Sequence, residues 1–116
     1  PDASTSENDL LLRYLNKDHD YRHQLGAYAS VPRLGLVDDN WGYRGNDTFA
    51  SNVWWNFKSF FGYGNITAAD WFTTLNIDTY LWAFGGGGGS YTSAGGVGTS
   101  AQFGNTDSKA VFNILF

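Results

Sequence analysis

Apolar residues recur along the chain in two different periods, which predicts helices alternating with short strands. Between residues 8 and 23 the apolar side chains fall at i, i+1, i+4 and i+5, as on one face of an amphipathic helix: Leu10, Leu11, Tyr14 and Leu15. Ser6, followed three residues later by Asp9, resembles a capping box at the start of this helix. Gly26 and Pro32 are expected to end it.

Two further helices are expected in the middle of the chain. Residues 48–61 carry aromatic and aliphatic side chains close to helical spacing, with Asp47 or Thr48 as the cap and Gly62 as the stop. Residues 68–75 predict a shorter helix.

Three apolar runs predict strands near 34–38, 79–84 and 110–116. Nearly continuous apolar runs that alternate with helices are typical of an α/β fold with a mainly parallel sheet and flanking helices. We therefore expect residues 1–116 to form a single α/β unit. The apolar end at Leu115 and Phe116 also suggests an interior piece of a longer protein.

The segment 85–104 is rich in Gly, Ser, Thr and Ala and begins with five consecutive glycines. It is too long for a tight connection, so it is predicted as a long Gly-rich loop. No helix-forming run follows these glycines, and Gly104 is expected to break any helix there.

The amino-acid composition of the chain excludes several classes of binding partner and site. The 116 residues are 42% hydrophobic and 18% aromatic, which argues against intrinsic disorder. A net charge of −4 disfavours nucleic acid, which needs clustered Lys and Arg. The chain has no Cys, so it holds neither a disulfide nor a thiolate zinc site. No apolar run approaches the length that spans a bilayer.

Polar residues lie at the carboxyl end of the first predicted strand, and glycines lie at the carboxyl end of the second. If the two strands are parallel neighbours, both ends lie at one edge of the sheet, where α/β folds place their sites. The predicted binding rim consists of Asp38, Asp39, Asn40, Trp41, Gly85, Gly86 and Gly87. It suits Ca²⁺, or a carbohydrate stacked on Trp41, better than phosphate, which the carboxylates repel. The alternative is a solvated turn beside glycines that only pack.

His19 and His23 stand four residues apart on the first predicted helix, which is the spacing of two zinc ligands. A third ligand would have to come from Asp38, Asp39 or sequence outside this chain. The alternative is a polar helix end at which His favours the helix dipole.

The run from Arg33 to Tyr43, the strand Tyr80 to Phe84 with its glycines, and the run from Ala110 to Phe116 resemble parts of large secreted or surface bacterial proteins. Their layout is similar to that of the caspase–gingipain clan. That resemblance implies a parallel α/β sheet in which one strand ends in a catalytic His-Gly and a later strand ends in Cys. Here the strand ending at Phe84 runs into glycines without His, and no Cys is present. This departure argues against peptidase activity of these 116 residues.

Together these features predict a non-catalytic structural or interaction segment of a secreted or cell-surface bacterial protein. Its expected partners are other parts of the same longer chain or a surface assembly. The alternative function is a part of a caspase- or gingipain-like hydrolase whose catalytic residues lie outside this chain.

Overall fold

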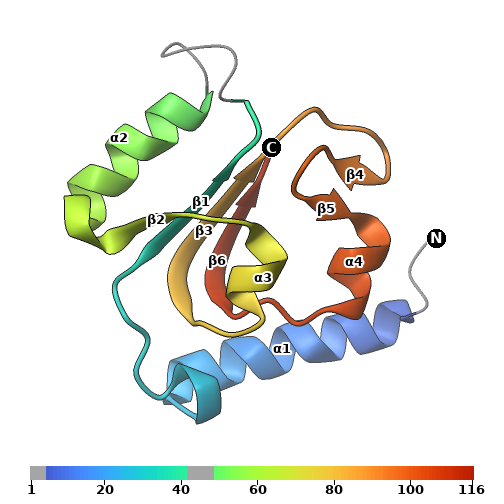
Figure 1. Ribbon diagram of the computed structural model, residues 1–116. Coiled ribbons are helices and arrows are strands. Elements are labelled where there is room, and N and C mark those ends of the chain that lie inside the picture. Colours follow the sequence, from blue (N-terminus) through green and yellow to red (C-terminus); the bar gives the residue numbers. More distant parts are fainter. Residues whose placement is uncertain (1–4, 42–48) are drawn as a thin grey trace.

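A four-stranded parallel sheet forms the centre of the protein in a computed structural model that describes residues 5–41 and 49–116 (Figure 1). The strands lie in the order β2 (Ile66–Ala68), β1 (Gly35–Asp39), β3 (Tyr80–Gly86), β6 (Ala110–Leu115). The prediction of an α/β fold with a mainly parallel sheet is therefore confirmed.

Helices cover the two faces of the sheet unequally. On one face lies α2 (Phe49–Phe61). On the other lie α3 (Trp71–Leu75), α4 (Ser100–Asn105) and a small antiparallel hairpin of β4 (Ser93–Ala94) and β5 (Gly98–Thr99) (Figure 1). The caps predicted for α2, Asp47 and Thr48, lie outside the described residues.

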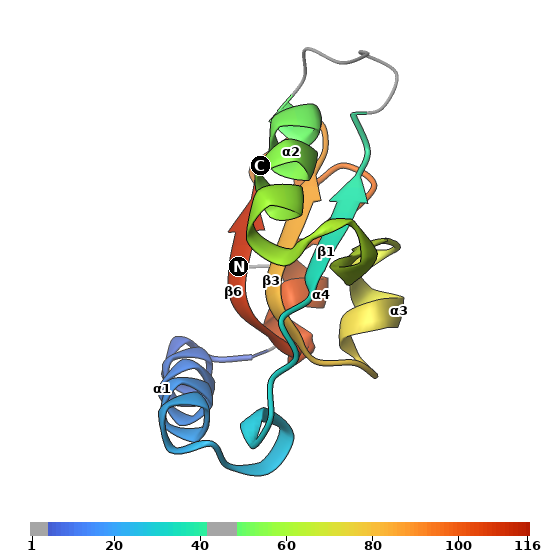
Figure 2. The same cartoon turned by 90° about the vertical axis from the view of Figure 1, so that its left-hand side faces the viewer.

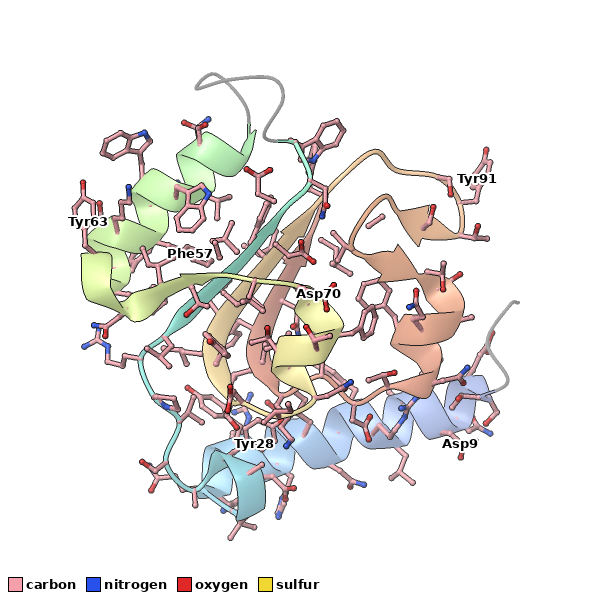
Figure 3. The ribbon with its side chains drawn as sticks, viewed as in Figure 1. Asp9, Tyr28, Phe57, Tyr63, Asp70 and Tyr91 are labelled. Carbon is pink, nitrogen blue, oxygen red and sulfur yellow. The ribbon has the colours of Figure 1, made fainter. Side chains whose placement is uncertain are left out.

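Each face of the sheet has its own apolar core, because successive strand residues point to opposite sides. The core under α3 and α4 is built from buried residues of five segments: Leu36, Trp71, Leu75, Tyr80, Ala83, Val97 and Ala110. The core under α2 is smaller, with Val37, Phe57 and Phe84 buried at its centre. Figure 3 shows Phe57 pointing from α2 toward the strands, whereas Tyr63 and Tyr91 lie at the outer surface.

The first helix, α1 (Glu7–His23), begins as predicted but packs in an unusual way. The Ser6 side chain accepts a hydrogen bond from the Asp9 N–H, and the chain leaves the helix through Gln24 in the left-handed region. No residue of α1 is buried. It lies at the amino ends of the strands, on the β6 side of the molecule (Figure 2).

Two segments differ from the expectation. Residues 66–68, for which no strand is predicted, add β2 to the edge of the sheet beside β1. The segment 85–104, predicted as a loop, holds the end of β3, the β4–β5 hairpin and most of α4. Helix α4 also includes Gly104, because Thr99 and Gln102 form a capping box at its start.

No helix in the described part of the chain has the length and apolar character that crossing a membrane requires.

Candidate functional site

The carboxyl ends of β1 and β3 lie side by side. In this parallel pair, Asp38 stands opposite Gly85 and Asp39 opposite Gly86. The structure therefore brings the carboxylates and the glycines of the predicted rim to the same edge of the sheet.

Asp38 links the end of β1 to the start of α3. Its side chain is buried, with 8% of the residue surface exposed. One carboxylate oxygen accepts a hydrogen bond from the Trp71 N–H at 3.0 Å, and the other accepts from the Asn40 side-chain amide at 3.0 Å. A Ca²⁺ ion bound by Asp38 would have to share its two oxygens with these hydrogen bonds.

Burial raises the pKa of Asp38, and the two hydrogen bonds to its carboxylate oppose the rise. A carboxyl whose pKa is higher in the folded state than in the unfolded state binds its proton more tightly when folded. Its contribution to stability is therefore fully present below the ordinary Asp pKa and is lost as the pH rises through the raised value.

We expect the substitution Asp38→Asn to remove this loss. The free energy of unfolding of the Asp38→Asn variant, minus that of the unmodified protein, should therefore increase as the pH rises from about 4 toward neutrality. Urea unfolding of both proteins across this range measures the difference. A constant difference would show that the Asp38 carboxyl titrates normally.

The residues after Asp38 fix the turn by which the chain leaves β1. The Asp39 side chain accepts a hydrogen bond from the Trp41 N–H at 2.7 Å, and the Asn40 N–H donates to the Gly86 carbonyl at 2.8 Å. The edge of the Trp41 ring lies close over Gly86. These contacts give the predicted rim residues a local structural role.

The glycines bring the chain's own backbone into contact at this edge. The Gly87 N–H donates to the Phe116 carbonyl, and the Gly95 N–H donates to the Gly88 carbonyl. A Cβ atom on Gly87 would stand 1.8 Å from the Gly95 carbonyl oxygen. Glycine therefore lets the β4–β5 hairpin pack directly on the end of the sheet.

The candidate zinc ligands lie at opposite ends of the sheet. The rings of His19 and His23 are 4.4 Å apart on α1, near the amino ends of the strands. Asp38 and Asp39 lie at the carboxyl end of β1. Among the described residues, no three His, Cys, Asp or Glu side chains gather in a group that could hold a metal ion.

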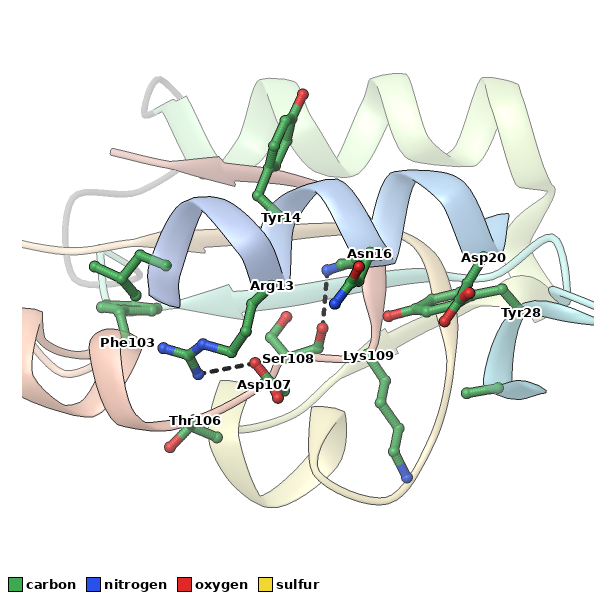
Figure 4. A pocket seen from close by; sticks show the side chains of 13 residues that line it. Arg13, Tyr14, Asn16, Asp20, Tyr28, Phe103, Thr106, Asp107, Ser108 and Lys109 are labelled. Carbon is green, nitrogen blue, oxygen red and sulfur yellow. Dashed lines mark hydrogen bonds and ion pairs between the residues drawn. The ribbon is translucent and has the colours of Figure 1, made fainter. Parts of the chain in front are cut away.

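A cleft of about 500 Å³, which sequence reasoning missed, separates α1 from the segment that precedes β6 (Figure 4). Arg13 forms an ion pair with Asp107 at 2.9 Å and also donates to the Gly104 carbonyl. The Lys17 ammonium donates to the Ser108 carbonyl at 2.8 Å. Burial lowers the pKa of Lys17, and the charge of Asp107 opposes this. Polar contacts thus hold α1 in place.

The second feature that sequence reasoning missed is an apolar groove of about 560 Å³ beside α2, over β3 and β6. The Trp82 ring stacks on Phe112 with their centroids 4.9 Å apart, and Ile114 continues this surface along β6. From α2, Phe60 stands at its border with 69% of its surface exposed. We call Phe60, Trp82, Phe112 and Ile114 the open flank.

The open flank exists because α2 covers only part of its face of the sheet. Adjacent strands are about 4.8 Å apart, and a helix with its side chains is about 10 Å wide, so one helix covers about two strands. Helix α2 packs on Val37 of β1 and Phe84 of β3. On the same face, Phe112 and Ile114 of β6 remain 41% and 39% exposed.

The chain was compared with models of protein families, with curated proteins and with solved structures, and none of them matches it.

Proposed function

We propose that this chain is a non-catalytic structural and interaction segment of a secreted or cell-surface bacterial protein. It joins another polypeptide, either in the same longer chain or in a surface assembly, through the open flank. The segment contributes a rigid parallel sheet and one uncovered apolar surface, and the partner supplies the helix that covers it.

The exposed aromatic and aliphatic side chains of the open flank carry this proposal. Contiguous apolar surface of this kind marks interaction sites, since leaving it in water is unfavourable. β6 also has a single neighbour, β3, among the described strands. Its residues Ala110–Leu115 include no charged side chain and no proline, the usual protection of a sheet edge.

The backbone of β6 offers a second means of attachment. The Phe116 N–H and carbonyl both bond to β3, through Gly85 and Gly87. Because backbone groups alternate in direction along a strand, Val111, Asn113 and Leu115 direct theirs to the outer side. A strand of the partner could extend the sheet there.

The composition supports a secreted or surface setting. A chain without Cys is indifferent to the redox state of its compartment. Its abundant Gly and aromatic residues are in keeping with such a setting.

If the open flank serves a partner, its side chains should contribute little to the stability of the chain itself. We expect Phe60→Glu to change the free energy of unfolding by less than about 1 kcal/mol, because Phe60 is largely exposed. The matched control is Phe57→Glu on the same helix, where the side chain is 5% exposed. Burying a carboxylate there should cost several kcal/mol or prevent folding.

Urea unfolding followed by circular dichroism measures both variants. Equal losses of stability would mean that Phe60 holds the fold together, and the open flank would then not be a surface kept for a partner.

A further inference from the structure

Helix α1 carries three leucines on its outer side. Leu11 and Leu12 are each 56% exposed and Leu15 is 51% exposed. The side that faces the protein carries Arg13 and Lys17, whose contacts are polar. It also carries Leu10, Tyr14 and Tyr21, which line the clefts on that side. An ordinary amphipathic surface helix would bury leucines such as Leu11 and Leu15 against the core.

The outward leucines form a stripe with an acidic end. Residues four positions apart lie on one side of a helix, so Glu7, Leu11 and Leu15 line up along α1. Over 17 residues the helix is about 26 Å long, which is enough to run the length of α2.

The groove of the open flank is complementary to this stripe. Its described lining is apolar apart from Asn56 and Arg33, and Arg33 carries the one charge among these residues. A helix that lies in the groove with its leucines inward and an acidic residue at the Arg33 end would satisfy both features.

Helix α1 and the open flank also touch each other within one molecule. The Tyr21 ring of α1 meets the Phe112 ring of the open flank edge to face, with centroids 5.8 Å apart. Because α1 already lies beside the open flank of its own molecule, two copies related by a two-fold axis near this contact could each offer the outward side of α1 to the other's groove.

We propose that the open flank binds α1 of a second copy of this chain, and that the exchange is reciprocal. Leu11 and Leu15 of each copy enter the groove beside α2 of the other, and Glu7 stands next to Arg33. This inference rests on the proposed function, because it takes the open flank to be a docking surface and names its occupant.

Complementary variants test this arrangement. One variant, Leu11→Glu with Leu15→Glu, changes only the stripe, and the other, Phe60→Glu with Ile114→Glu, changes only the groove. Sedimentation equilibrium should show a dimer for the unmodified protein and a more than about 100-fold weaker self-association for each variant. An equimolar mixture of the two should form a heterodimer, since one stripe and one groove remain intact.

The control variant is Tyr91→Glu, on the fully exposed tip of the Gly-rich segment, which should leave the dimer unchanged. If the double groove variant does not fold, Phe60→Glu alone replaces it in the mixture.

Because the chain has no Cys of its own, introduced cysteines give an independent test of the contact between α1 and the groove. Under mild oxidation, Leu15→Cys chains mixed with Ile114→Cys chains should form a disulfide mainly between the two different chains. Disulfides mainly between like chains would indicate pairing of α1 with α1 or of β6 with β6, and would overturn the proposed exchange.

A monomer up to millimolar concentration, or a mixture that fails to associate, would also overturn it. If the protein is monomeric while Phe60→Glu leaves its stability unchanged, a second copy is excluded as the occupant and the proposed function stands. If Phe60→Glu is as costly as Phe57→Glu, the proposed function itself fails.

Discussion

Gly87→Ala is expected to lower the free energy of unfolding by about 3 kcal/mol, since among the described glycines Gly87 has the closest neighbouring atom to an added Cβ. The new Cβ atom would stand 1.8 Å from the Gly95 carbonyl oxygen, and both partners are backbone atoms that cannot rotate away. The β4–β5 hairpin would have to lift from the end of the sheet and take the buried Val97 out of the core.

The matched control is the next glycine. No heavy atom lies within 4 Å of a Cβ built on Gly88, so Gly88→Ala should change stability by less than about 1 kcal/mol. Urea unfolding of the two variants measures the difference. Equal stabilities would mean that the Gly-rich segment does not pack on the sheet as described.

Trp71→Ala is expected to cost about 3–5 kcal/mol. Trp71 is 1% exposed at the start of α3, and its ring packs edge to face on Phe103 of α4. Removing the ring leaves a cavity where β1, α3 and α4 meet. The control is Trp55→Ala on α2, where the ring is 62% exposed and contacts the Lys58 ammonium. Its loss should cost less than about 1 kcal/mol.

Thermal unfolding followed by Trp fluorescence and circular dichroism compares the two Trp variants. A Trp55 variant as unstable as the Trp71 variant would contradict the assignment of the main core to the α3 and α4 side.

Three strands of the sheet could be predicted from local pattern because each is a short, nearly continuous apolar run. β1 and β3 are mostly buried, whereas β6 is largely exposed after Ala110. The runs at 34–38, 79–84 and 110–116 correspond to β1, β3 and β6. β2 could not be predicted in this way. It spans three residues, Ile66–Ala68, and owes its existence to pairing with β1, about thirty residues away.

In helix α4, the low helix propensity of Gly104 is outweighed by other interactions. Gly104 lowers helix propensity, yet Thr99 and Gln102 satisfy the first free N–H groups, and Phe103 packs against Trp71 and Phe72. Tertiary contacts therefore decide the local structure at this position.

The candidate site was predictable in part. Parallel pairing of two recognisable strands is enough to expect Asp38 and Gly85 at one edge. The hydrogen bond from the Trp71 N–H to Asp38 joins residues 33 positions apart, so it could not be predicted from a local sequence pattern. The open flank could not be predicted either, because the alternation of Phe112 and Ile114 is the same whether or not a helix covers them.

Hydroxyl-radical footprinting tests the central claim, that the open flank is kept for a partner, most directly. The side chains of Phe60, Phe112 and Ile114 should be oxidised in the purified chain when it is dilute enough to be monomeric, and protected in intact cells that produce the protein. Tyr91 should be oxidised equally in both. Equal oxidation of the open flank in both settings would show that nothing covers it and would contradict the account.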